Sequence, residues 1–314
     1  MTVEPDVASA PLADLKRGIP LGYAFAATGA ILFSTKAIIV KLAYGIGVEP
    51  DTLLALRMGF SLPCYLAIGF LALRRRRQRS LPPHSARIFA KAMLIGVLGM
   101  WFASYSDFLG LEYISAQFER LILFTYPLFV VLFGALFFKQ RIRVLALVAL
   151  GVSYAGLALI FTEHLSLEGQ NVLVGTAFVI AAAISFALYQ LLAKEAIAGL
   201  GPGLFTCVAM TGASAAAFLE FFTRHDGRSL LIGGPLLGYS LFLALAATVL
   251  PSFFMNAALH RISAQANAAI GILGPIATTL LAVAILGEPL TAIGMAGTAL
   301  VLAGVGWFTL AERE

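Results

Sequence analysis

Charged residues and cysteines are both scarce in this sequence, and each shortage excludes a class of protein. Only 12% of the 314 residues are charged, whereas a typical soluble domain has about 25%. The two cysteines, Cys64 and Cys207, lie inside apolar runs, so the sequence has neither a disulfide framework nor the spacing of a metal or redox site. Since 60% of the residues are hydrophobic, the surplus apolar surface needs a bilayer as its solvent.

Motifs for catalysis and for direct use of ATP are also missing. The chain contains no P-loop, no His-Glu-x-x-His and no Gly-x-Ser-x-Gly. Its four histidines, His84, His164, His225 and His260, are spread over loops and the ends of apolar runs. An enzyme inside the membrane needs catalytic groups that cluster. We therefore expect a protein that is not an enzyme and that uses no cofactor or metal.

Long apolar runs are what the sequence has in abundance. A helix needs about 20 apolar residues to cross the hydrocarbon layer. Ten runs of suitable length occur, at 20–43, 52–73, 88–111, 116–138, 144–161, 172–193, 204–222, 236–259, 264–286 and 291–310. The segments between them are too short for a soluble domain. We expect an all-α membrane protein with ten transmembrane helices.

Lysine and arginine are distributed unevenly between the connecting segments. With the N-terminus placed in the cytoplasm, fifteen of the 21 cationic residues fall on that side, two fall outside and four lie within apolar runs. The positive-inside rule then places both termini in the cytoplasm. The arginine cluster at 74–79 directly follows the second run, so we expect it to face lipid headgroups and not nucleic acid.

An internal repeat relates the two halves of the chain. Ile-Ser-Ala-Gln at 114–117 recurs 148 residues later at 262–265, and a proline follows ten residues after each glutamine. Each half holds five runs, and because five is odd the second half enters the membrane from the opposite side. We expect inverted five-helix repeats at 20–161 and 172–310, an extracytoplasmic linker at 162–171, and cytoplasmic tails at 1–19 and 311–314.

The two repeated prolines, Pro127 and Pro275, lie near the middle of their apolar runs. A proline inside a helix removes one backbone hydrogen bond and kinks the helix. Inverted repeats with interrupted helices typically surround a transport path near the middle of the bilayer. We therefore predict that Pro127 and Pro275 act as hinges of a conformational change.

The combination of these motifs resembles a known group. Two five-helix repeats, a Ser-Ala step into a helix with a central proline, and Gly287-Glu288 after the ninth run resemble the EamA-type repeats of the drug/metabolite transporter superfamily. The first copy departs from the pattern, with Lys139-Gln140 in place of Gly-Glu. Overall the chain is most similar to YddG-type bacterial exporters of aromatic amino acids. The resemblance implies efflux across the inner membrane through a cavity lined by spans 1, 3, 4, 6, 8 and 9.

Several charged side chains fall inside the apolar runs, where each charge costs about 2.5–3.5 kcal/mol on insertion scales. The cations are Lys36, Arg57 and Arg120, and the anions that could offset them are Asp107 and Glu119. Two interpretations remain open. The five groups could form a buried network that closes an extracellular gate, or one cation, first of all Lys36, could hold the carboxylate of a substrate.

Polar and aromatic residues near the middle of the runs complete the predicted binding site. They are Trp101, Ser104, Tyr105, Tyr126, Tyr189, Ser252, Phe253 and Asn256. Aromatic walls with a few polar groups suit an apolar or aromatic ligand. The first run has no carboxylate, which argues against the proton antiport of cationic drugs that small multidrug members of the superfamily perform.

The leading hypothesis is a secondary transporter that exports aromatic or other neutral amino acids by alternating access. A monomer suffices for this mechanism, so the expected partners are the small-molecule substrate and the lipid bilayer. Within the same class, the substrate could instead be a sugar phosphate, a nucleotide sugar or a drug. A non-transporting membrane scaffold and an intramembrane enzyme are the alternatives from other classes.

Overall fold

Apolar runs become helices because inside a bilayer only a helix or a closed barrel satisfies its own backbone hydrogen bonds. The computed structural model describes residues 12–80, 82–138, 144–168, 171–230, 233–259, 261–262, 270–271 and 273–311. Within these residues every regular element is a helix. The repeated Ile-Ser-Ala-Gln of the second half lies largely outside the described residues.

The first half of the chain runs back and forth through the bundle. Its elements are α1 (Leu12–Gly45), α2 (Pro50–Gln78), α3 (Ala86–Gly96), the π-helical segment η1 (Val97–Phe102), α4 (Ala103–Tyr113), α5 (Ala116–Leu123), α6 (Tyr126–Phe138) and α7 (Val144–Glu168). Helices α3, η1 and α4 follow one another without a break and form one span.

The second half repeats the arrangement. Its elements are α8 (Asn171–Leu200), α9 (Pro202–Arg224), the 3-10 segment η2 (Gly227–Leu230), α10 (Pro235–Ala244), the π-helical segment η3 (Leu245–Val249), α11 (Leu250–Leu259), α13 (Leu273–Leu281), the π-helical segment η4 (Ala282–Leu286) and α14 (Ala292–Ala311). Helices α10, η3 and α11 again form one continuous span.

Seven helical segments of the described chain are long and apolar enough to cross a membrane. They coincide with the first, second, third, fourth, sixth, seventh and eighth of the expected runs. The other three runs contain shorter apolar helices in the described part, at Gly151–Glu163, Leu273–Leu286 and Ala292–Trp307. The protein is thus an all-helical, multi-pass membrane protein, and the total of ten spans stays a prediction.

The packing of the helices pairs one half of the chain with the other. Helix α2 packs on α9, α7 on α14 and α5 on α13. In addition, α1 packs on α11 in the same way that α4 packs on α8. If the ten expected runs are numbered in order, the second run packs on the seventh and the fifth on the tenth. The contact between the first and eighth runs has its counterpart in the contact between the sixth and third. A pseudo-twofold axis between inverted repeats produces this set of pairs.

Two local irregularities also recur in both halves. Segments η1 and η3 lie 148 residues apart, and single π-helical turns within α-helices often occur at functional sites. In the fourth span α5 ends at Leu123, and Pro127 is the second residue of α6, where a missing N–H costs nothing. Pro275 is the third residue of α13. Both prolines therefore lie at the start of a helical segment; the side chain of Pro127 is outside the described part.

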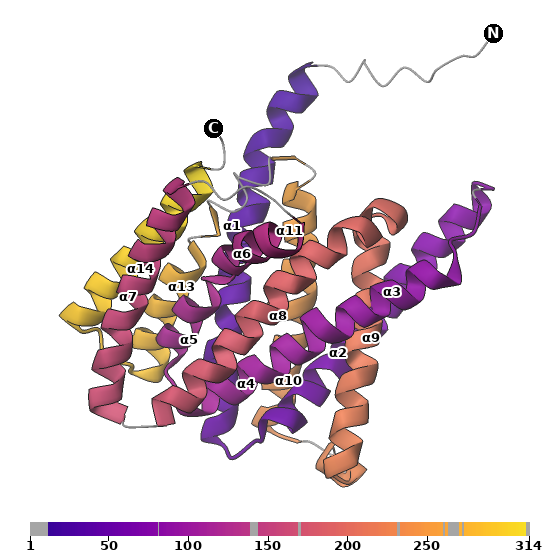
Figure 1. Ribbon diagram of the computed structural model, residues 1–314. Helices are drawn as coiled ribbons and strands as arrows, with labels where there is room; N and C mark the ends of the chain where they lie inside the picture. The colour runs from indigo at the N-terminus through magenta and orange to yellow at the C-terminus, as the bar shows by residue number, and fades with distance from the viewer. Residues whose placement is uncertain are drawn as a thin grey trace.

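The bundle has two distinct ends in Figure 1. Helix α1 begins and α14 ends at the top of the view, and the turn from α2 to α3 projects near the same level; we call this the terminal end. Helix α1 ends at Gly45 and α9 ends at Arg224 at the bottom, which we call the distal end. The arginine cluster in the last turns of α2 lies at the terminal end and agrees with a cytoplasmic position for that end.

The orientation can be checked with single cysteines in a background where Cys64 and Cys207 are replaced by alanine. Gly45 and Gln78 are both exposed and lie at opposite ends of the bundle. We expect a membrane-impermeant maleimide to label Gly45→Cys in intact cells and to label Gln78→Cys only after permeabilisation, because the cationic residues gather at the terminal end. Labelling in the reverse order would place the terminal end outside.

Candidate functional site

A cavity of about 260 Å³ lies between α2, α9 and α11. Its lining consists of Tyr65, Pro202, Gly203, Thr206, Cys207, Ser252, Phe253 and Ala257. Pro202 and Gly203 open helix α9 at the terminal end, where Gly201 precedes them with a φ of 77° that favours glycine. The cavity therefore occupies the half of the bundle nearer the terminal end.

Two of the predicted binding residues, Ser252 and Phe253, lie in the wall of this cavity. The Ser252 hydroxyl donates to the backbone oxygen of Thr248 at 2.7 Å and lies 3.4 Å from the Tyr65 hydroxyl. The wall thus combines aromatic surface with hydroxyl groups. Spans two, seven and eight provide it, and only the eighth belongs to the set that the family resemblance implies. Tyr65 and Cys207 stand in apolar runs without a motif to mark them, so sequence reasoning missed them.

The buried charges near the distal end form a separate cluster. The ammonium of Lys36 on α1 donates to Oδ2 of Asp107 on α4 at 2.5 Å and lies 3.6 Å from Oε1 of Glu119 on α5. The three residues are 5%, 2% and 0% exposed. Such burial leaves little solvent to screen the charges, so the cluster connects three helices through strong electrostatic attraction.

Arg57 and Arg120 do not join these ion pairs. Arg57 donates from Nε to the Thr248 hydroxyl at 2.8 Å and lies over the ring of Phe108, 5.5 Å from its centre. Arg120 lies 5.9 Å from the centre of the Phe33 ring. Of the five charges that one interpretation placed in a single network, the structure brings three together and places the other two on aromatic rings.

A second connection at the distal end joins the two halves of the chain. The Ser115 hydroxyl caps α5 by accepting from the N–H of Phe118 at 3.1 Å. Glu288, which follows the ninth span, accepts from the N–H groups of Ala116 and Gln117 at 2.7 and 3.2 Å. A carboxylate at a helix N-terminus is stabilised by the helix dipole and by the free N–H groups. The Gly-Glu motif of one repeat therefore caps the Ser-Ala motif of the other.

Trp101 and Tyr105 stack on each other, as their spacing of four residues on one helical face predicts. Their ring centres are 6.1 Å apart with an interplanar angle of 11°. The Tyr105 hydroxyl accepts from Nη1 of Arg224 at 2.8 Å at the end of α9. This aromatic pair is therefore tied to the distal rim and is not part of the lining of the cavity. Ser104, between the two rings in sequence, is half-buried.

Tyr126 and Tyr189 meet through Phe186 on α8. The ring of Tyr126 contacts Phe186 edge-on at 4.9 Å, and Tyr189 stacks on it at 5.8 Å. Tyr189 is 9% exposed and packs in an apolar core with α3 and α9. The side chain of Asn256 lies outside the described part. The aromatic residues of the predicted binding site are thus divided among three places in the structure.

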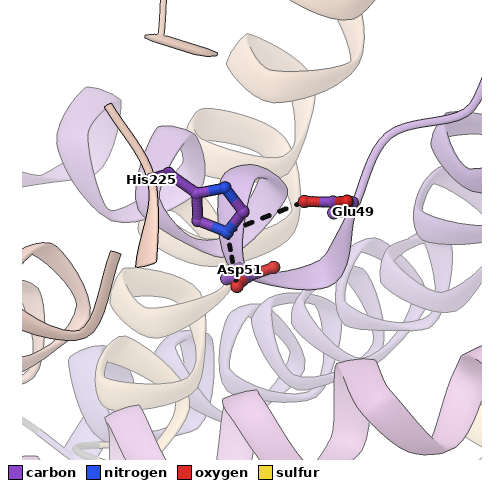
Figure 2. A group of neighbouring side chains, drawn as sticks. All are labelled: Glu49, Asp51 and His225. Atoms are coloured by element: carbon purple, nitrogen blue, oxygen red, sulfur yellow. Dashed lines mark hydrogen bonds and ion pairs between the residues drawn. The ribbon is translucent and has the colours of Figure 1, made fainter. Parts of the chain in front are cut away.

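A histidine and two carboxylates lie together on the distal rim (Figure 2). His225 directly follows α9, and its Nε2 lies 2.8 Å from Oδ2 of Asp51 in the first turn of α2 and 3.6 Å from Oε2 of Glu49. The possible ligand atoms of these three residues lie within 4.8 Å of one another, close enough to hold a metal ion. The hydrogen bond to Asp51 and the nearby carboxylates raise the pKa of His225.

The Lys36–Asp107 pair is open to a double-mutant cycle on the detergent-solubilised protein. Breaking a buried ion pair leaves an uncompensated charge and costs about 3–5 kcal/mol. We expect Lys36→Met and Asp107→Leu each to lower the melting temperature, and the double variant to lose less than the sum of the two. Strictly additive losses would show that the two groups do not interact.

His225 should make stability depend on pH. Because the pKa of His225 is raised by Asp51, its charged form stabilises the protein fully below its unfolded pKa, and this contribution disappears as the pH rises through the higher folded value. We expect the melting temperature of the wild type to fall, relative to His225→Asn, as the pH rises above the ordinary histidine pKa of about 6.5. His84→Asn, a change at the other end of the bundle, should leave this difference in place. Parallel pH profiles for wild type and His225→Asn would contradict the coupling.

Comparison with known proteins identifies the family of this chain. The sequence matches the EamA-like transporter family over residues 20–162 and 173–310. It is 31% identical over 298 residues to the uncharacterized transporter YcbK of Bacillus subtilis (strain 168), which covers 90% of this chain and 92% of that protein. An uncharacterized transporter of Archaeoglobus fulgidus is 26% identical over 261 residues, covering 82% of this chain and 87% of its own length.

The fold agrees with a solved structure as well. A protein of known crystal structure superposes with a TM-score of 0.62 over 95% of this chain and 98% of its own, at 16% sequence identity. An identity this low supports the fold alone. Because both halves of the sequence match one family and a relative aligns over nearly the full length, the protein belongs to the EamA-like transporter family and is a multi-pass membrane transporter.

Proposed function

We propose that the protein exports aromatic or other neutral amino acids across the bacterial inner membrane by alternating access. One observation carries the proposal: the cavity lies in the terminal half, while the distal half is closed by contacts between helices. A secondary transporter that faces the cytoplasm has this arrangement when the terminal end is cytoplasmic. Export then requires the distal contacts to open after the ligand has bound.

The lining of the cavity supports a small amphipathic ligand. The rings of Tyr65 and Phe253 offer apolar surface, and the hydroxyls of Ser252 and Thr206 offer hydrogen bonds. A volume of about 260 Å³ lies just below the range of about 300–1,000 Å³ that drug-sized ligands occupy. A ligand of amino-acid size fits this cavity better than a nucleotide sugar does.

The closed distal half supports alternating access. The ion cluster of Lys36 connects three helices of the first repeat there, and the cap from Glu288 connects the second repeat to the first. The segments η1 and η3, together with Pro127 and Pro275, interrupt regular helix at related places in the two halves. In the proposed cycle these interruptions act as hinges, because backbone that lacks regular hydrogen bonds bends at lower cost.

A second candidate class is favoured by another cavity. It has a volume of about 360 Å³, lies at the terminal end, and is lined by Arg75, Arg76, Arg79 and His84 beside the start of α9. The two cavities share Gly203. A cluster of guanidinium groups suits phosphate, so a phosphorylated metabolite is the alternative substrate of the same transport mechanism.

The test is flux from proteoliposomes loaded with labelled phenylalanine or tryptophan. We expect efflux above that of protein-free vesicles, and we expect Phe253→Ala to weaken the apparent affinity about tenfold, because burial of an aromatic side chain contributes about 1.5–3 kcal/mol. Vesicles loaded with a labelled sugar phosphate test the alternative. Absence of amino-acid flux in either orientation would refute the proposal.

A further inference from the structure

Arg57 is a buried cation that forms no ion pair with an acidic side chain among the described residues. Its side chain lies inside the protein, with the residue 5% exposed, and not on the lipid-facing surface. No carboxylate lies within ion-pair distance of it among the described residues, and its Nη1 is buried without a hydrogen-bond partner there. A buried charge in this state costs several kcal/mol unless an anion compensates it. This free-energy cost would be offset by an anionic ligand that binds reversibly next to Arg57.

Lys36, the other buried cation of this region, is already compensated. It pairs with Asp107 and lies near Glu119, so two carboxylates surround one ammonium. A ligand carboxylate at Lys36 would have to compete with Asp107, which already pairs with its ammonium. Within the described part of the chain, the guanidinium of Arg57 makes one hydrogen bond, from Nε to the Thr248 hydroxyl. The charge balance therefore favours Arg57 over Lys36 as the contact for an anionic ligand.

A chain of contacts leads from the cavity to Arg57. The Tyr65 and Ser252 hydroxyls meet in the cavity wall, and Ser252 donates to the backbone oxygen of Thr248. Thr248 lies in η3, and its hydroxyl accepts from Arg57 and donates to the backbone oxygen of Leu243 in α10, five residues earlier. The π-helical segment thus positions Thr248 between the cavity and the guanidinium.

The chain itself contains a comparison for Arg57. Gly59, Ser61 and Leu66 recur as Gly212, Ser214 and Leu219, an offset of 153 residues. At the same offset Arg57 corresponds to Met210, which is 3% exposed. A methionine therefore fills the equivalent place in the second repeat. Packing alone does not require a guanidinium at this position, and the charge must have another use.

We propose that Arg57, which lies behind the cavity wall next to Thr248, binds the carboxylate of the transported ligand. This rests on the proposed function and specifies its substrate class: a carboxylate with an apolar or aromatic side chain. The guanidinium can hold a carboxylate through two parallel N–H groups. Phe108 beneath the guanidinium and the aromatic cavity wall provide apolar surface nearby. Loss of the α-carboxylate should therefore remove binding more completely than a change of side chain.

The test compares ligands that differ in the carboxylate, using thermal stabilisation of the full-length protein in detergent. Probes are phenylalanine, phenylalaninamide, 3-phenylpropionate and benzoate. We expect the carboxylates to raise the melting temperature of the wild type and phenylalaninamide to have no effect. Arg57→Met should weaken carboxylate affinity about ten- to hundredfold, as expected for the loss of a hydrogen bond to a charged group. Arg57→Lys should restore part of it.

Matched variants separate the explanations. Met210→Leu changes the equivalent place in the other repeat and should bind the carboxylates as the wild type does. Lys36→Met tests the rival cation. Equal carboxylate affinity in Arg57→Met and wild type would overturn the proposal, as would a loss confined to Lys36→Met. If 3-phenylpropionate or benzoate binds through Arg57 but phenylalanine does not, the proposed amino-acid substrate is refuted. The proposed carboxylate site at Arg57 is then retained. If none of the carboxylates binds the wild type, both proposals fall.

Discussion

A charge inside a membrane protein is costly unless another charge compensates it, and this cost explains how the distal half of the bundle is held together. Lys36, Asp107 and Glu119 come from α1, α4 and α5, three helices of the first repeat, and meet with almost no exposure to solvent. Attraction in such a medium is strong and falls only slowly with distance. The same half carries the cap from Glu288. The cavity lies in the other half, and none of its lining residues carries a charge.

The membrane class, seven of the spans and the members of the ion cluster were predictable from the sequence. Apolar length determines a span, and a charge inside an apolar run is rare enough to stand out. The partners of Lys36 were narrowed to Asp107 and Glu119, but the sequence does not contain the rotation of each helix about its axis. For that reason Arg57 and Arg120 were grouped with the cluster although they lie on Phe108 and Phe33.

The cavity and the π-helical segments could not be predicted, for different reasons. Tyr65 and Cys207 line the cavity only because α2 and α9 pack against each other, a contact between distant parts of the chain. A single π-helical turn shifts the hydrogen bonding by one residue and leaves the apolar pattern unchanged. The structure is needed to show that π-helical segments occur at corresponding positions of the two halves, in η1 and η3. The repeated motif showed that the two halves are related, but it did not show that Glu288 of one half caps the helix that Ser115 opens in the other.

The cap from Glu288 makes the two ends of the molecule unequal. Its carboxylate binds two N–H groups at the start of α5, while the corresponding place in the first repeat has Lys139-Gln140, which cannot provide a carboxylate. In a cycle of alternating access, separation at the distal end must break these charge-assisted hydrogen bonds. A ligand shifts such an equilibrium only by the difference in its affinity for the two states. In the proposed cycle, the Glu288 cap therefore stabilises the state in which the distal end is closed.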